Sequence, residues 1–298
     1  MKTSKLKIGY FADGPWSHEA FLKINNDLRF DIRFIVPRID TKDETLLGFS
    51  KQFKIDYLKL KNVNSEQNLK SISDYDCDIL VSMSFNQIFK KKIIDLTPIG
   101  IINCHAGKLP FYRGRNILNW VLINDEKEFG ITVHFVDEGI DTGDIILQKT
   151  FPITDKDNYS ALLEISYNAC ANILYEALVK IVDEDYERIN QKTIHPVGFY
   201  CGMRSDGDEI INWNDTSRNI FNFIRAISKP GPISRTYNNS TEITINNSNY
   251  INKAPSYIGT IGQVLSKTEL GFLVKTKDSF IEIFDLTGKI KVGDKLGK

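Results

Sequence analysis

Apolar, strand-like segments and helix-like segments alternate along the first two thirds of the chain. The apolar run Leu6–Ala12 is followed by the turn Asp13-Gly14-Pro15 and by a helix-like stretch over residues 17–28. Because strands that are apolar throughout need cover on both faces, this alternation is typical of a mostly parallel sheet between helices. The pattern predicts further strands over 31–36, 78–82, 100–104, 130–136 and 144–150, and further helices over 45–53, 65–72, 87–95, 115–124 and 159–183.

The pattern changes after residues 194–208, a stretch with one proline, three glycines and several polar residues that reads as a linker. Beyond it we expect one helix over residues 216–228, opened by the cap-like sequence Asp215-Thr216-Ser217. Short strand-like runs follow over 241–245, 258–265, 272–276 and 280–284. They predict a small β-rich domain. We therefore divide the chain into an α/β domain (1–193), a linker (194–208) and a helix with a β-barrel-like domain (209–298).

Composition narrows the classes of protein to consider. The 298 residues include 38 lysines and arginines against 38 aspartates and glutamates, so the chain lacks the basic excess of a general nucleic-acid binder. The four cysteines lie far apart, which fits reduced thiols in the cytoplasm. No run of 18 apolar residues exists, and residues 1–12 do not resemble a signal peptide. We expect a cytoplasmic protein without a membrane partner.

Candidate chemistry follows the predicted strand over residues 100–104. Side chains alternate along a strand, so Asn103 and His105 face one way and Cys104 faces the other. In an open α/β sheet active sites form where strands end. An amide and an imidazole placed together there can stabilise a developing oxyanion. The glycine-rich turn around Asp141 can bring a carboxylate beside the imidazole, where it would orient His105 or accept a proton.

Simpler roles compete with each of these. His105 can be an ordinary polar residue at a strand end, and Asp141 can serve only to form a turn. Pairing of Cys104 with His105 as nucleophile and base is disfavoured, since the two side chains face opposite ways. The four histidines show no metal-ligand spacing, so we predict no metal site. The turns after the strands also lack the glycine patterns of dinucleotide and P-loop sites.

Several ordered motifs resemble the folate-dependent formyltransferase family, which includes the methionyl-tRNA, glycinamide ribonucleotide and sugar-nucleotide enzymes. The resemblance implies a Rossmann-like catalytic domain with a smaller OB-like domain, and 10-formyltetrahydrofolate as formyl donor without a metal. It also implies that Asn103 and His105 stabilise the oxyanion of the tetrahedral intermediate, while Asp141 positions His105 and assists proton removal. The motifs run over most of the chain: Asn103-x-His105, Leu109-Pro110-x-Tyr112-Arg113-Gly114, Gly130–His134, Asp141–Asp144, Ile211-Asn212-Trp213, Ile224-Arg225-Ala226 with Pro230, Gly262–Leu265 and Gly293-Asp294.

The family binds the pterin largely through backbone groups, and here these fall on Phe85–Phe89 and Val136–Ile140. The arginines near the site suit a diphosphate, because a guanidinium forks onto phosphate oxygens. Bracing of the loop is the competing role for Arg113, joining of a helix to the sheet is the competing role for Arg225, and packing is the competing role for Tyr112. The residues implied in folate binding are Phe85, Asn86, Gln87, Ile88, Val136, Asp137, Gly139 and Ile140; those implied in acceptor binding are Tyr112, Arg113, Arg115, Asn116 and Arg225.

The resemblance is closest to the sugar-nucleotide branch, through residues 112–122. The transfer-RNA enzymes carry a basic, glycine-rich insertion after the second strand, where this chain has the segment Val36–Glu44, with two basic against three acidic residues. Residues 204–298 hold 13 lysines and arginines against 10 acidic residues, too weak an excess to require tRNA binding. We expect a nucleotide-linked amino sugar as partner, with a dTDP-4-amino-4,6-dideoxy sugar for surface polysaccharide, such as lipopolysaccharide O-antigen, as the first choice.

Two alternatives stay open: a methionyl-tRNA formyltransferase, and a catalytically silent folate-binding or interaction protein on the same scaffold. Sequence also leaves two roles open for the C-terminal region. It could shape the acceptor side of the site, or it could form a homodimer.

Overall fold

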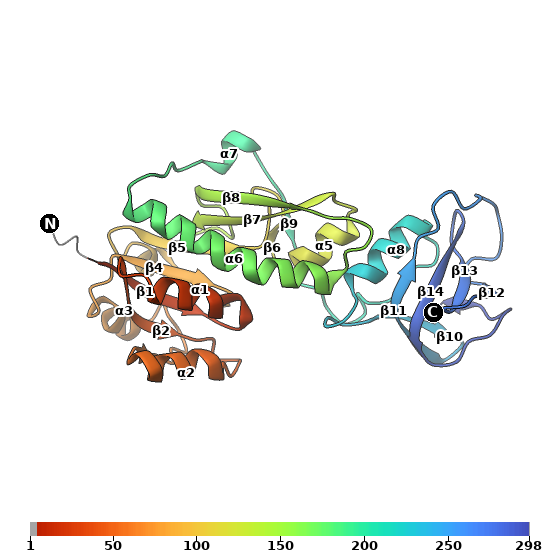
Figure 1. The fold of residues 1–298 in the computed structure, drawn as a ribbon, viewed down its shortest axis with the longest axis horizontal. Helices are drawn as coiled ribbons and strands as arrows, with labels where there is room; N and C mark the ends of the chain where they lie inside the picture. Colours follow the sequence, from red (N-terminus) through yellow and green to blue (C-terminus); the bar gives the residue numbers. More distant parts are fainter. Residues whose placement is uncertain (1–4, 298) are drawn as a thin grey trace. The chain divides into compact units, whose positions relative to one another are not determined.

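A seven-stranded sheet forms the centre of the first part of the chain in the computed structural model, which describes residues 5–297 (Figure 1). The strand order is β3-β2-β1-β4-β5-β7-β8. The first five strands in this order pair in parallel, and β7 pairs antiparallel with β5. The predicted Rossmann-like, mostly parallel sheet is thus confirmed. The strands are β1 (Leu6–Ala12), β2 (Phe30–Val36), β3 (Asp56–Tyr57), β4 (Ile79–Met83), β5 (Gly100–His105), β7 (Glu128–Phe135) and β8 (Ile145–Pro152).

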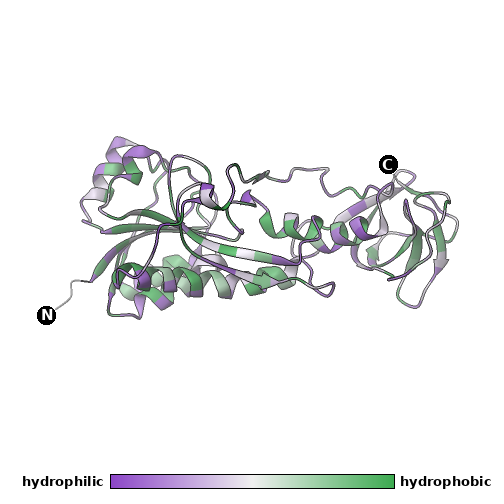
Figure 2. Ribbon diagram, turned by 90° about the horizontal axis from the view of Figure 1, so that it is seen from above, coloured by the Kyte–Doolittle hydropathy of each residue, from purple (hydrophilic) through white to green (hydrophobic). Residues whose placement is uncertain are grey.

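Helices cover both faces of this sheet, as the apolar character of its strands predicts. On one face α1 and α6 meet through the edge-to-face contact of Trp16 with Tyr167, and Cys104 on β5 reaches the α6 backbone. On the other face Phe11, Phe34 and Leu80 pack with residues of α3 and α4. Figure 2 shows hydrophobic residues along these strands and along α6. The helices are α1 (Pro15–Asn25), α2 (Glu44–Phe53), α3 (Glu66–Ser73), α4 (Lys91–Ile94), α6 (Tyr159–Val182) and α7 (Gln191–Ile194).

A six-stranded sheet with the order β12-β13-β14-β11-β10-β15 forms the C-terminal part, which confirms the predicted β-rich domain. Its helix α8 begins after Thr216, whose hydroxyl accepts from the Asn219 N–H, as the cap-like sequence predicts. Apolar residues of α8, among them Ile220 and Ile224, pack against the isoleucines of the sheet. The elements are α8 (Ser217–Ala226), β10 (Ser234–Asn238), β11 (Thr241–Asn249), β12 (Val264–Lys267), β13 (Phe272–Lys275), β14 (Phe280–Thr287) and β15 (Leu296–Gly297).

Two predicted elements are wrong in extent. The helix expected over residues 87–95 is reduced to α4, because the Gln87 side chain bonds the backbone of Leu60 and Val63, and the Lys90 N–H donates to Asn64. The strand expected over residues 258–265 begins only at Val264, and Ile258 is fully exposed. The strand β10 was not predicted, since its two buried positions, Ser234 and Thr236, are themselves polar and give no apolar alternation.

Backbone contacts divide the described chain into two compact units. The first comprises the residues up to Gly114, with Phe129–Phe151 and Glu164–Tyr200. The second comprises Arg115–Glu128, Pro152–Leu163 and the residues from Cys201 onward, so it includes α5 (Ile117–Ile123) as well as α8. The division into 1–193, 194–208 and 209–298 stays a prediction.

The segment expected to be a linker carries structure of its own. Within it β9 (Tyr200–Cys201) pairs with β6 (Arg113–Gly114) in a two-stranded sheet. The same segment thus runs beside the loop that follows β5. Among the residues that the structure describes, no helix combines the length and apolar character needed to span a membrane.

Candidate active site

Asn103 and His134 form the first pair of the candidate site, and strand pairing brings them together. They are direct partners in the antiparallel register of β5 and β7, so their side chains share one face of the sheet. Asn103 Nδ2 lies 3.3 Å from His134 Nε2, while His134 Nδ1 lies 2.7 Å from the carbonyl of Phe135. In the neutral ring a proton on Nδ1 satisfies that carbonyl and leaves Nε2 to accept from Asn103.

His105 stands two residues further along β5, on the same side as Asn103. Its Nε2 lies 2.7 Å from the Tyr112 carbonyl, to which it donates, and its Nδ1 lies 3.7 Å from Asp141 Oδ2. A Cβ on Gly107 would come within 2.4 Å of Nε2, so glycine is what lets the imidazole occupy this place. Cys104 faces away, as alternation predicts, and its thiol donates to the Cys170 carbonyl.

Asp141 completes the site from the turn between β7 and β8. Its Oδ2 accepts from the Gly114 N–H at 2.9 Å, and its Oδ1 lies 3.5 Å from His134 Nε2. Burial raises the pKa of this carboxyl. His105, His134 and the Gly114 N–H together lower it by more, so the pKa of Asp141 lies well below its usual range. The carboxylate stays ionised beside two imidazoles.

The arrangement can perform general acid–base chemistry next to a hydrogen-bond donor. Asn103 uses one Nδ2 hydrogen toward His134 and has a second hydrogen for a reacting oxygen. A proton on His105 Nδ1 would lie beside the Asp141 carboxylate. Among the described residues no three histidine, cysteine or acidic side chains are grouped as metal ligands. The amide, the imidazoles and the carboxylate can together stabilise an oxyanion and transfer a proton.

Comparisons with known proteins show the family to which the chain belongs. A family model described as formyl transferase matches residues 33–178, and one described as formyl transferase, C-terminal domain, matches residues 204–292. A methionyl-tRNA formyltransferase of Syntrophomonas wolfei is 32% identical over 238 residues, covering 80% of this chain and 74% of that protein. This chain belongs to the formyltransferase family.

Two other similar proteins are not described as methionyl-tRNA enzymes. The bifunctional polymyxin resistance protein ArnA of Wigglesworthia glossinidia brevipalpis is 32% identical over 216 residues, which cover 70% of this chain and 33% of ArnA. The structure of WlaRD, a sugar 3N-formyltransferase solved with dTDP and 5-N-formyl-THF, matches with a TM-score of 0.70 at 26% identity. That match covers 97% of this chain and all of WlaRD. The fold and the family are thus shared by enzymes of more than one substrate class.

The formyltransferase residues expected from the sequence fall into three groups in the structure. The three expected catalytic residues, Asn103, His105 and Asp141, lie together. Their roles remain proposals.

The expected folate-binding residues lie on two loops that follow β4 and β7. Ile88 and Ile140 are more than half exposed. Gln87 instead turns its side chain to the Leu60 and Val63 backbone. The Asp137 carboxylate accepts from the Gly139 N–H and the Thr142 hydroxyl, and the Val136 N–H donates to the Ile101 carbonyl.

The expected acceptor-binding residues contact protein groups. The buried guanidinium of Arg113 donates to Gln191, to the Val197 carbonyl and to the Tyr200 hydroxyl. Arg225 is also buried and donates to the carbonyls of Thr154 and Asp157. These contacts are the bracing that competes with phosphate binding, and phosphate binding stays a prediction for both.

The other three expected acceptor residues are also held by protein groups. Tyr112 is buried with its ring edge-on to Phe199. Arg115 contacts the Met203 sulfur, and Asn116 accepts from the Arg204 N–H.

Sequence reasoning missed two residues. His134 was quoted within a motif but not chosen as a site residue, because only the register of β5 and β7 places it opposite Asn103. Gln191 lies in a polar stretch without any motif, yet it is 2% exposed and donates to the backbone carbonyls of Asp141 and Gly143. A buried amide in a polar segment leaves no periodic signal.

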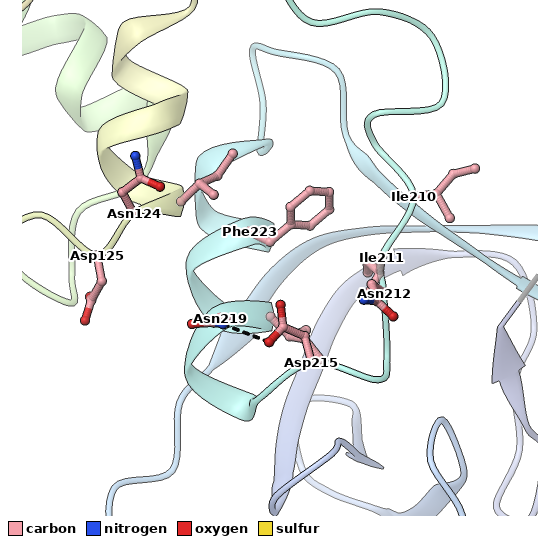
Figure 3. A pocket seen from close by; sticks show the side chains of 10 residues that line it. Asn124, Asp125, Ile210, Ile211, Asn212, Asp215, Asn219 and Phe223 are labelled. Atoms are coloured by element: carbon pink, nitrogen blue, oxygen red, sulfur yellow. Dashed lines mark hydrogen bonds between the residues drawn. The ribbon is translucent and has the colours of Figure 1, made fainter. Parts of the chain in front are cut away.

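A hollow of about 380 Å³ lies in the second unit (Figure 3). Its carboxylates already have partners: Asp215 accepts from Asn219 at 2.8 Å, and Asp125 accepts from Arg218. It contains none of the expected site residues. Its lining consists of Ile123, Asn124, Asp125, Ile210, Ile211, Asn212, Asp215, Asn219, Ile220 and Phe223.

Proposed function

We propose that this chain transfers the formyl group of 10-formyltetrahydrofolate to the amine of a nucleotide-linked amino sugar. The observation that carries the reaction is the convergence of Asn103, His105 and Asp141 at the end of β5, in a chain of the formyltransferase family. An amide donor, an imidazole and an ionised carboxylate are what acyl transfer to an amine requires.

In the proposed reaction the neutral amine attacks the formyl carbon and forms a carbon–nitrogen bond. The formyl oxygen becomes an oxyanion. It accepts a hydrogen bond from the second Nδ2–H of Asn103, and the charge of a protonated His105 stabilises it. The attacking nitrogen then loses a proton, for which the ionised Asp141 is the acceptor, directly or through water. The bond between the formyl carbon and folate N10 breaks as N10 takes up this same proton from Asp141, directly or through water. Tetrahydrofolate and the formylated amine are released, and Asp141 is again ionised.

The loops at residues 85–89 and 136–140 fit the folate in two respects. Asn86 Oδ1 is buried without a hydrogen-bond partner among the described residues, and such an acceptor suits the N–H groups of a pterin. Ile88 and Ile140 expose apolar surface at the same two loops, and an aromatic ring system would cover it.

A sugar nucleotide as acceptor is supported by the match to WlaRD, which extends over that whole enzyme. The loop between β2 and α2 supports it too. Arg38 there pairs with Asp40, and Lys42 pairs with Glu44, so these two cations already have carboxylate partners. The expected basic, glycine-rich insertion of a tRNA enzyme is replaced by a short loop with balanced charge.

Methionyl-tRNA is the second candidate acceptor, and a specific observation favours it. The Syntrophomonas wolfei enzyme of that name shares 32% identity with this chain, more than the 26% shared with WlaRD. Binding of tRNA would weaken steeply with salt, because phosphate contacts release counterions.

A direct assay separates these acceptors. Release of tetrahydrofolate from 10-formyltetrahydrofolate is followed with a panel of dTDP-, UDP- and GDP-linked amino sugars, with the amine at position 3 or 4, and with charged initiator tRNA. We expect turnover with one dTDP-linked sugar and none with tRNA. Turnover with tRNA alone would refute the sugar acceptor. Turnover with no acceptor would favour a folate-binding protein that lacks catalysis.

The finer features stay predictions within this proposal. They are a 4-amino-4,6-dideoxy sugar as acceptor, a role in surface polysaccharide synthesis, a cytoplasmic location and a homodimer. WlaRD is described as a sugar 3N-formyltransferase, so the panel must contain sugars with the amine at position 3 and at position 4.

A further inference from the structure

Gln191 joins the two backbone segments that hold the catalytic residues. It is the first residue of α7 and is 2% exposed. Its Nε2 donates to the carbonyl of Asp141 at 2.9 Å and to that of Gly143 at 2.8 Å. Its Oε1 accepts from both Nε and Nη2 of Arg113, at 3.1 and 2.7 Å. One amide thus uses both its donors and its acceptor inside the protein.

The turn to which Gln191 donates has a strained backbone conformation that these hydrogen bonds stabilise. Asp141 has a φ of 54°, a left-handed conformation that costs an ordinary L-residue free energy. A Cβ on Gly143 would lie 1.9 Å from the Phe135 carbonyl oxygen, so the turn is pressed against the end of β7. Two hydrogen bonds to carbonyls two residues apart fix this conformation, and with it the direction of the Asp141 carboxylate.

The Gln191 amide oxygen is linked to the same pair, His105 and Asp141, through Arg113. The residues that flank Arg113 supply the Tyr112 carbonyl to His105 and the Gly114 N–H to Asp141. The guanidinium also fixes which way the amide points, because the flipped amide would turn its N–H groups toward Arg113 and its oxygen toward two carbonyls.

Position 191 is itself fixed by neighbouring backbone bonds. Ile189 and Ile145 exchange two hydrogen bonds of 2.9 Å, which tie the segment to the start of β8. The Asn190 side chain accepts from the Lys192 N–H and caps α7. The amide is therefore held in place before any substrate binds.

We propose that Gln191, held by Arg113, is a positioning residue that sets the geometry of the His105–Asp141 pair. This role rests on the proposed formyl transfer but does not depend on which acceptor is used. It differs from the phosphate-binding role expected for Arg113, which would affect acceptor affinity rather than the catalytic pair.

The decisive variant is Gln191→Glu, which keeps the acceptor toward Arg113 and removes both donors toward the turn. We expect kcat to fall about 10²-fold with the KM values for folate and acceptor little changed, as for a misplaced catalytic group. The matched control is Thr193→Val, which removes the bond from the Thr193 hydroxyl to the Asn190 carbonyl within α7 without removing a bond to the turn. It should keep kcat within about threefold of the wild type. Unchanged kcat in Gln191→Glu would overturn the proposal.

A second readout is independent of turnover. The chain has four histidines, so the imidazole nitrogens can be assigned by NMR with single substitutions. In Gln191→Glu the signals of His105 and His134 should shift, while that of His18, which contacts Asp43, should not. If wild-type protein formylates no acceptor, the proposed function fails, yet this comparison still decides the role of Gln191. Unshifted His105 and His134 signals would refute it.

Arg113→Lys keeps the test valid if Gln191→Glu does not fold. A lysine cannot fork onto Oε1, so the amide loses its fixed orientation. We expect a roughly tenfold lower kcat and shifted His105 signals. A higher KM for the acceptor with unshifted histidine signals would instead assign Arg113 to phosphate binding and overturn the proposal.

Discussion

Two buried or half-buried carboxylates, Asp141 in the first unit and Asp125 in the second, have lowered pKa values for different reasons. Asp141 faces His105 and His134, with one backbone N–H as a further donor. Arg218 Nε donates to Asp125 Oδ1 at 3.0 Å. Burial raises the pKa of Asp125, but the hydrogen bond and charge of Arg218 contribute to a larger lowering, to a pKa of about 2.

The difference lies in the partner rather than in the acid. Arginine stays charged at any pH a protein meets, whereas histidine is the side chain whose charge ordinarily changes between pH 5 and 8. Arg218 also forks onto Asp155 and lies over the rings of Phe221 and Tyr250. A carboxylate among arginines therefore suits a permanent brace, and a carboxylate among imidazoles suits proton transfer. The predictions below test this contrast.

Loss of either partner in the first unit should have the largest effect. We expect His105→Ala or Asp141→Asn to lower kcat by 10²-fold or more, as for loss of an oxyanion donor or its orienting group. The measurement is kcat at saturating folate and acceptor. A variant that keeps nearly full kcat would contradict the proposed mechanism.

Stability should follow the ionisation of Asp141. The folded-state pKa lies below the unfolded value near 4, so the stabilising effect is present above that pH and is lost as the pH falls through the folded pKa. We expect Asp141→Asn to lower the free energy of unfolding by about 1–3 kcal/mol at pH 7. The loss should be smaller at pH 3, where the unfolded carboxyl is largely protonated and the folded one is still ionised. Urea denaturation at the two pH values measures this. An equal loss at both would show that the charge is not involved.

His134 should contribute less, because it acts through Asn103 and Asp141. We expect His134→Gln to lower kcat roughly tenfold, since an amide can replace only one of the two imidazole nitrogens. The control is His18→Gln, the same exchange at a histidine that contacts Asp43, which should keep kcat within about twofold. Equal losses in both variants would remove His134 from the site.

The arginine brace should matter only for stability. Arg218→Met keeps an apolar stem against Phe221 but removes the charge, and we expect a loss of about 1 kcal/mol with kcat unchanged. Arg33→Met serves as the control, because its exposed pair with Asp31 should contribute less than about 0.5 kcal/mol. A large fall in kcat for Arg218→Met would mean that this region takes part in catalysis.

Much of the α/β fold could be predicted, because most of its strands are largely apolar and the apolar residues of its helices recur every three to four positions. The C-terminal strand β10 could not, since only two of its five residues are fully buried. Asn103 and His105 could be placed on one face because a strand alternates, whereas the contact of His134 depends on the register between β5 and β7. Local periodicity carries no information about register between distant segments.

By itself the sequence determined the fold class, the ordered motifs of the family and the three residue types that its chemistry requires. Only the tertiary structure decided that His134 joins Asp141, that Gln191 holds the turn, and that Arg113 and Arg225 donate to protein groups. The physical reason is range. Propensity and alternation act over a few residues, while a buried polar group is satisfied by whichever partner the folded chain brings within hydrogen-bonding distance.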